Sequence, residues 1–106
     1  MSVFPLPEIN DFFDERLIIS WKLTQPLHLP PLKNILIEIS ADPQLIFDPL
    51  QDPKLNIAEL NNSDYIINWV IRKPKTKTEV TLSIQNDIIS EKHCLHINPK
   101  TFPQTV

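Results

Sequence analysis

The sequence of 106 residues contains no glycine. Glycine is the residue that most readily lets a backbone adopt positive φ or lie against a phosphate. Its absence excludes the P-loop, the Rossmann fingerprint, the glycine-rich loop of protein kinases and the nucleophile elbow of α/β-hydrolases. An EF-hand calcium loop of the usual form is excluded for the same reason. The sequence therefore lacks the commonest motifs of nucleotide binding and acyl transfer.

Cysteine is nearly absent as well. The single cysteine, Cys94, excludes an internal disulfide, and with it the disulfide-stapled scaffold of small secreted domains. The first residues have neither the basic nor the apolar segment of a signal peptide. No apolar run reaches the roughly 20 residues that a membrane-spanning helix requires. These absences predict a cytoplasmic protein that does not associate with a membrane.

The length and composition of the chain indicate one folded domain. The length suits a single domain, and 42% hydrophobic residues with a formal net charge of −3 are typical of an ordinary soluble globular protein. The eleven prolines separate short apolar segments and favour turns between them. We expect an N-terminal arm over residues 1–14, a folded domain over residues 15–100 and a C-terminal tail over residues 101–106.

Alternating polar and apolar residues predict β-strands along most of the chain. In residues 65–72, for example, Ile67, Trp69 and Ile71 lie on one face of the predicted strand. Only residues 7–14 are expected to form a helical turn. The links between strands are too short for parallel crossovers, so the pattern predicts an all-β, antiparallel sandwich. Its seven expected strands are residues 16–23, 32–40, 44–47, 54–60, 65–72, 78–85 and 92–98.

Three features follow one another in the second half of the chain. They are the Asn-Ser turn at residues 60–64, a strand that carries Trp69, and a closing strand that ends at Pro99. In this order they are similar to the immunoglobulin-like sandwiches of the major-sperm-protein, ASH and NEW3 type, over residues 44–99. The resemblance implies a seven-stranded immunoglobulin-like sandwich that binds peptides or partner domains and has no chemistry of its own.

The ligand of these families does not carry over. In major sperm proteins, lysines and threonines after the Asn-Ser turn bind acidic peptides. The corresponding positions here are Val70, Arg72, Lys73 and Pro74. Only the basic character around Arg72 matches, so the resemblance indicates a kind of module and leaves its ligand open.

A basic loop follows the strand at residues 65–72. Arg72, Lys73, Lys75 and Lys77 place four positive charges within six residues. Such a loop suits contact with a phosphate or an acidic peptide. The alternative is a solvated hairpin loop whose lysines keep a sheet edge from pairing. Nucleic acid is not expected as a partner, because the chain is acidic overall and no aromatic residues are interspersed to stack on bases.

Two adjacent phenylalanines near the N-terminus are a second candidate. Phe12 and Phe13 lie among acidic residues, which suits docking onto a groove or a basic pocket of a partner. The alternative is that they cover the open end of the sandwich, as ordered chain termini often do.

His93, Cys94 and His96 lie close together and are candidates for metal or nucleophilic chemistry. On a strand, Cys94 and His96 share one face and His93 lies on the other, whereas a structural zinc site uses four converging ligands. No residue in the sequence is placed to activate Cys94. We expect no catalytic residue, no metal and no cofactor; a small hydrolase, or an inhibitor of one, that uses residues 93–96 is the enzymatic alternative.

The sequence thus predicts a non-catalytic protein–protein interaction module. Its partner would be another protein or a peptide, bound by an edge strand or by the basic loop. A self-assembling structural subunit is the main alternative. In that case Ile66 and Val70, on the second face of the strand at residues 65–72, would form the contact between copies.

Overall fold

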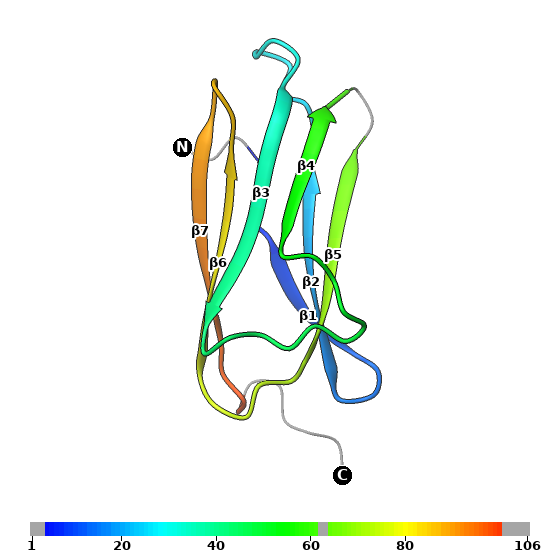
Figure 1. The fold of residues 1–106 in the computed structure, drawn as a ribbon, viewed down its shortest axis with the longest axis vertical. Helices are drawn as coiled ribbons and strands as arrows, with labels where there is room; N and C mark the ends of the chain where they lie inside the picture. The colour runs from blue at the N-terminus through cyan, green and yellow to red at the C-terminus, as the bar shows by residue number, and fades with distance from the viewer. Residues whose placement is uncertain (1–3, 62–63, 101–106) are drawn as a thin grey trace.

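The protein is an antiparallel β-structure of two sheets. The structure, a computed structural model, describes residues 4–61 and 64–100, which form seven strands and no helix (Figure 1). One sheet has the strand order β1-β2-β5, and the other has the order β4-β3-β6-β7. The all-β prediction is confirmed, and the predicted tail lies outside the described residues. The strands are β1 (Glu8–Phe12), β2 (Arg16–Leu23), β3 (Lys33–Asp42), β4 (Lys54–Glu59), β5 (Tyr65–Arg72), β6 (Thr78–Gln85) and β7 (Ser90–Ile97).

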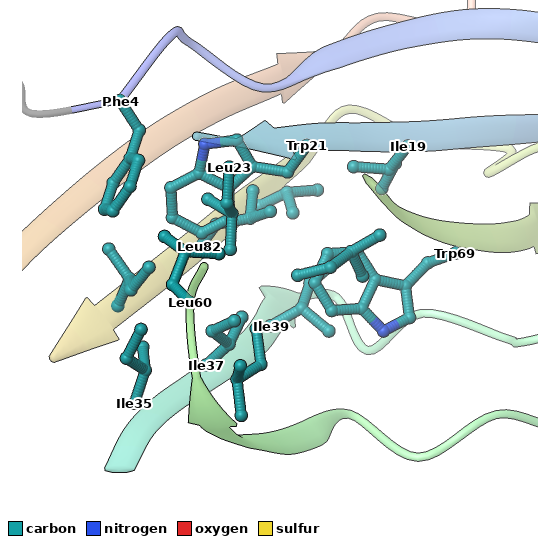
Figure 2. Close-up of a cluster of buried hydrophobic side chains, with 14 of the residues drawn as sticks. Phe4, Ile19, Trp21, Leu23, Ile35, Ile37, Ile39, Leu60, Trp69 and Leu82 are labelled. Atoms are coloured by element: carbon teal, nitrogen blue, oxygen red, sulfur yellow. The ribbon is translucent and has the colours of Figure 1, made fainter. Parts of the chain in front are cut away.

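A core of aliphatic side chains and two tryptophans lies between the sheets (Figure 2). Successive side chains of a strand point to opposite faces of the sheet, and the apolar members of each alternating pattern face inward. Trp21 of β2 and Trp69 of β5 are both buried. Each fully buried Leu or Ile side chain contributes about 1.5–3 kcal/mol. The inward faces of β2, β3, β5 and β6 therefore supply most of the stabilisation.

The helical expectation for residues 7–14 is wrong. Glu8–Phe12 forms β1, which pairs along its whole length with β2. Its residues are mostly exposed, so their sequence lacks the alternation that reveals a half-buried strand. Before β1, Phe4 is buried in the core, and the Trp21 Nε1–H donates to the Pro5 carbonyl oxygen at 3.0 Å. Pairing with β2 thus makes residues 8–12 a strand, although the polar and apolar pattern of their sequence does not distinguish a strand from a helix.

The strand predicted at residues 44–47 is also wrong. Within this segment only Phe47 makes a β-bridge, to Ile71 of β5. The link between β3 and β4, residues 43–53, crosses from one sheet to the other (Figure 1), and its residues 46–51 bond to the free edge of β5. We call it the 43–53 segment. The remaining six predicted strands are present with small shifts at their ends.

Turns without glycine are made by residues that tolerate the left-handed region. Asp14 and Glu15 in the β1–β2 turn have φ of 63° and 58°, and Asn34 near the start of β3 has φ of 53°. Asn and Asp adopt this region at lower cost than most residues, because their short side chains bond locally. The β1–β2 turn brings Phe13 and Arg16 to the same end of the sandwich as the 43–53 segment.

Candidate functional site

Three loops meet at one end of the sandwich, which we call the groove end. They are the β1–β2 turn (residues 12–16), the 43–53 segment and the β5–β6 loop (residues 72–77). The reason is the pairing of β2 with β5, which places Arg16 directly opposite Arg72. The segments that carry all six residues predicted to bind a partner therefore lie at this end (Figure 1). Those residues are Phe12, Phe13, Arg72, Lys73, Lys75 and Lys77.

Asp48 holds the two arginines together. Like charges directly opposite on neighbouring strands repel each other. The carboxylate of Asp48 lies between them, with its Oδ2 accepting a hydrogen bond from Arg72 Nε at 2.9 Å and lying 3.3 Å from an Arg16 guanidinium nitrogen. Desolvation raises the pKa of Asp48, but the charge of Arg16 and the hydrogen bonds from Arg72 and Arg16 together lower it below its usual value. This ion triad pins the 43–53 segment to both strands.

The 43–53 segment also covers the outer edge of β5. The Asp48 N–H donates to the Val70 carbonyl oxygen at 3.0 Å, and the Arg72 N–H donates to the Ile46 carbonyl oxygen at 2.9 Å. The Gln51 side chain accepts from the Val70 N–H and donates to the Asn68 carbonyl oxygen. The half of β5 that approaches the groove end is therefore unavailable for pairing with another strand.

The four predicted cations differ in their surroundings. Lys73 is only 7% exposed at its side chain, and its Nζ lies 3.0 Å from Asp11 of β1. Arg72 is exposed but bound to Asp48. Lys75 and Lys77 are exposed, and within residues 4–61 and 64–100 no ion pair involves either of them. Two of the four cations are thus structural, and two are open to a partner.

Phe12 and Phe13 lie beside the same ions. Their rings are 4.4 Å apart between centroids, and the Arg16 guanidinium lies 5.8 Å from the centre of the Phe13 ring. Phe13 is 65% exposed and Phe12 is 37% exposed. The alternative in which these rings cover the open end of the core is therefore wrong. They form an exposed aromatic corner next to the ion triad.

A groove of about 430 Å³ separates the 43–53 segment from the β5–β6 loop. Its volume lies within the range of small binding sites. Leu45 and Ile46 line one side, and Ile46 remains 63% exposed. Arg72, Lys73 and Lys75 line the other side, and among the residues that the structure describes no acidic one lines the groove. Sequence reasoning missed Leu45 and Ile46 because it assigned them to a short strand and not to a binding site.

The residues of β7 that suggested chemistry are not brought together. Cys94 and His96 face outward and His93 faces inward, as predicted. The side chains of His93 and Glu91 are 9% and 10% exposed, with His93 Nε2 3.5 Å from the Glu91 carboxylate. The His93 ring also meets Trp21 edge-on. In the described part of the chain, no three His, Cys, Asp or Glu side chains are grouped so that they could hold a metal ion.

Ile66 and Val70 do not form one apolar surface. Ile66 is 59% exposed and lies opposite Lys22, whereas Val70 is half-buried against the 43–53 segment. Between them lies Asn68, whose side chain accepts a hydrogen bond from Ser20 at 2.7 Å. The predicted contact between copies through this face therefore consists of two separated side chains.

Comparison with known proteins identified no family for this chain. No family model matches the chain, and neither a curated protein nor a solved structure matches it. The resemblance to major-sperm-protein domains therefore stays a prediction. Among the described residues, no helix has the length and apolar character that crossing a membrane requires.

Proposed function

We propose that the protein is a non-catalytic protein-binding module and that its partner docks at the groove end. The groove carries this proposal. It combines the exposed Ile46 with cationic side chains, beside Phe13 and the arginines of the ion triad. Aromatic residues and arginine are enriched where protein interfaces bind tightly. A partner would insert an apolar side chain into the groove and present acidic groups to Lys75 and Lys77.

The strand order supports an immunoglobulin-like topology for this module. In such a topology β1, β2 and β5 would correspond to strands A, B and E, and β3, β6 and β7 to strands C, F and G. β4 lies beside β3, where variable-type immunoglobulin domains place strand C′. Such sandwiches carry binding loops at their ends, which agrees with a site built from connecting segments. With a single cysteine and no disulfide, the cytoplasm remains the proposed location.

Docking at this end is favoured over addition of a partner strand to a sheet edge. The 43–53 segment covers β5 near the groove end. β7 carries the inward-facing Glu91 and His93, and inward-facing charges are a common device against pairing at an edge strand. The remaining edges, β1 and β4, are short and carry charged residues. Each edge therefore has a feature that disfavours another strand.

Photo-crosslinking from the groove tests the proposal. A benzoylphenylalanine at position 46 should form a covalent adduct with one protein partner in cells. The double variant Lys75→Glu/Lys77→Glu should abolish that adduct, because it reverses the charge that faces the partner's acidic groups. The matched control is Lys92→Glu, an exposed lysine on the outer face of β7, which should leave the adduct unchanged.

A crosslinker at position 92 provides the second control. An adduct formed equally from positions 46 and 92, or one that persists when Lys75 and Lys77 are reversed, would contradict docking at the groove end. The absence of any adduct from position 46 would contradict the module itself. Melting curves of each variant establish that the fold is retained.

A further inference from the structure

The 43–53 segment is attached to the sandwich mainly by polar contacts. Its residues are half-buried or exposed. Leu45 and Phe47 pack against the core while staying partly exposed, whereas Leu50 is 91% exposed. Burial of apolar surface is the largest force that holds a segment to a folded core. The 43–53 segment is therefore attached less firmly than the strands whose inward faces form that core.

The polar contacts of residues 46–51 reach one edge of β5. Two backbone hydrogen bonds join the segment to Val70 and Arg72. The Gln51 side chain acts there like a peptide group: it accepts from the Val70 N–H at 2.7 Å and donates to the Asn68 carbonyl oxygen at 2.8 Å. Asp48 adds its contacts with the two arginines. These contacts lie outside the pairing of β5 with β2, so they can break while that pairing stays intact.

Alternate residues of β5 bond to opposite sides of the strand. The N–H groups of Val70 and Arg72 point to the 43–53 segment, and we call them the segment-side amides. Because hydrogen bonding alternates along an antiparallel strand, the N–H groups of Trp69 and Ile71 point to β2, with which β5 pairs along its whole length. We call these the sheet-side amides. One strand thus carries two sets of amides, which report separately on the segment and on the sheet.

The 43–53 segment also forms one wall of the groove. Residues 43–46 line one side, and residues 72–76 line the other. The second wall is fixed to the sandwich, because the Lys73 side chain is 7% exposed and its Nζ lies 3.0 Å from Asp11 of β1. The wall that can move is the one that belongs to the segment. The groove is therefore complete only while residues 46–51 are bonded to β5.

We propose that the 43–53 segment opens and closes as a unit while the two sheets stay folded, and that it must be closed for the groove to bind its partner. This inference rests on the proposed function and adds the regulation of that same site. A partner that fits the complete groove binds only the closed form, so its binding shifts the population toward that form. Weakening the contacts of Asp48 or Gln51 lowers the closed fraction, and the apparent affinity for the partner falls with it.

Hydrogen exchange of the purified native protein, followed amide by amide by NMR, tests the opening. The segment-side amides should have protection factors at least about tenfold lower than the sheet-side amides, because local opening frees only the first set. Low concentrations of urea should reduce the protection of the sheet-side amides and leave the segment-side amides nearly unchanged, since a local opening exposes little surface. Equal protection and equal urea dependence of the two sets would overturn the proposal.

Two matched aspartate variants test what holds the closed form. Asp48→Asn should lower the protection of the segment-side amides by about fivefold, because hydrogen bonds to charged groups are lost when the segment opens. Asp64→Asn removes a carboxylate that pairs with Lys22 at 3.2 Å, next to the other end of β5. Its contacts persist while the segment opens, so the segment-side amides should keep their protection. Unchanged segment-side protection in Asp48→Asn, or a loss in Asp64→Asn, would overturn the proposal.

Photo-crosslinking from position 46 then tests the coupling to the partner. Gln51→Met removes two hydrogen bonds to β5 without a change in charge, and Gln51 lies outside residues 43–46, 72–76 and 78, which line the groove. The yield of the adduct should fall several-fold. The matched control, Gln85→Met at an exposed glutamine of β6, should keep the yield of the wild type.

The possible outcomes separate the two proposals. A full yield of adduct from Gln51→Met, with the protection of Arg72 lowered, would overturn the coupling between closure and binding. No adduct from the wild type would contradict the proposed function and the coupling that rests on it. The opening itself would still be decided by the exchange of the segment-side and sheet-side amides, which involves no partner.

Discussion

The two ends of the sandwich are held by different forces. At the groove end, Asp48 joins Arg16 to Arg72 and Lys73 joins the β5–β6 loop to Asp11. The opposite end, which we call the loop end, comprises residues 24–33, 59–61 and 86–89. There the side-chain amides of Gln25 and Asn86 hold the loops through neutral hydrogen bonds to the backbone. Ion pairs fix the loops at the groove end, whereas amide side chains fix the β2–β3 loop, whose base carries one ion pair between Lys22 and Asp64 at 3.2 Å.

This difference follows from the groups that each end has to pair: two facing arginines at one end and unpaired backbone carbonyls at the other. The two arginines are brought face to face by strand pairing, and a carboxylate is the group that relieves their repulsion. In the β2–β3 loop, prolines supply carbonyl oxygens but no N–H donors, and one amide satisfies several of these carbonyls at once. The contacts of Asp48 should therefore respond to pH and salt, whereas the neutral hydrogen bonds of Gln25 should not.

The largest loss of stability is expected when the hydrogen bonds of the Gln25 side chain are removed. Gln25→Met keeps the length of the side chain but removes the four hydrogen bonds of its amide. At about 0.5–1.5 kcal/mol for each net hydrogen bond, with partial replacement by water, the free energy of unfolding should fall by about 2–3 kcal/mol. Urea denaturation measures this loss, with Gln85→Met as the control at an exposed glutamine. A loss no larger than that of the control would mean that the prolines alone hold the loop.

Removing the charge of Asp48 at the groove end should lower the stability of the fold by a smaller amount, and that amount should depend on pH. Asp48→Asn keeps the shape of the side chain but leaves Arg16 and Arg72 without their shared carboxylate. The pKa of Asp48 is lowered in the folded protein, so its stabilisation is present above the unfolded pKa of about 3.9 and is lost as the pH falls through the lower folded pKa. Melting temperatures of wild type and variant should differ at pH 7 and converge in acid.

Salt separates the two ends more sharply. Exposed ion pairs weaken as the ionic strength rises, so the difference between wild type and Asp48→Asn should shrink between low salt and about 1 M salt. The difference between wild type and Gln25→Met should stay constant over the same range. Equal salt dependence of the two variants would contradict the distinction between a charged end and a neutral one.

The smallest effect concerns Asn34, which lies near the start of β3. Asn34 has a φ of 53°, a region that costs most residues other than glycine and asparagine roughly 1 kcal/mol. Asn34→Ala should lower the free energy of unfolding by about that amount, and Asn34→Gly should be close to neutral. The two variants differ only in backbone freedom, so identical denaturation midpoints would show that the positive φ has no energetic cost.

Strand prediction succeeded where one face of a strand is buried and failed where it is not. β2, β5 and β6 alternate because the core removes their inward side chains from water. β1 has little buried surface, so its sequence carries no period, and only its pairing with β2 makes it a strand. Residues 44–47 look like a strand because Leu45, Ile46 and Phe47 form a short apolar run between two Asp-Pro turns, yet the segment makes a single bridge to Ile71.

The candidate site was predicted in part. The cations and the paired phenylalanines stand out in the sequence because charge and aromatic residues cluster there. Their meeting at one end depends on the register of β2 against β5, which sets Arg16 opposite Arg72. The groove wall at Leu45 and Ile46 was missed, because an apolar residue that stays exposed has the same letter as one that is buried.

The sequence by itself determined the all-β class, the alternating core and the absence of glycine-dependent motifs, because each depends on local periodicity or on composition. Only the tertiary structure decided that β1 joins the sheet, that Asp48 lies between two arginines and that residues 46–51 reach the edge of β5. These features arise from contacts between residues far apart in the chain. Their energy depends on how whole strands pair and pack, and no short window of sequence carries that information.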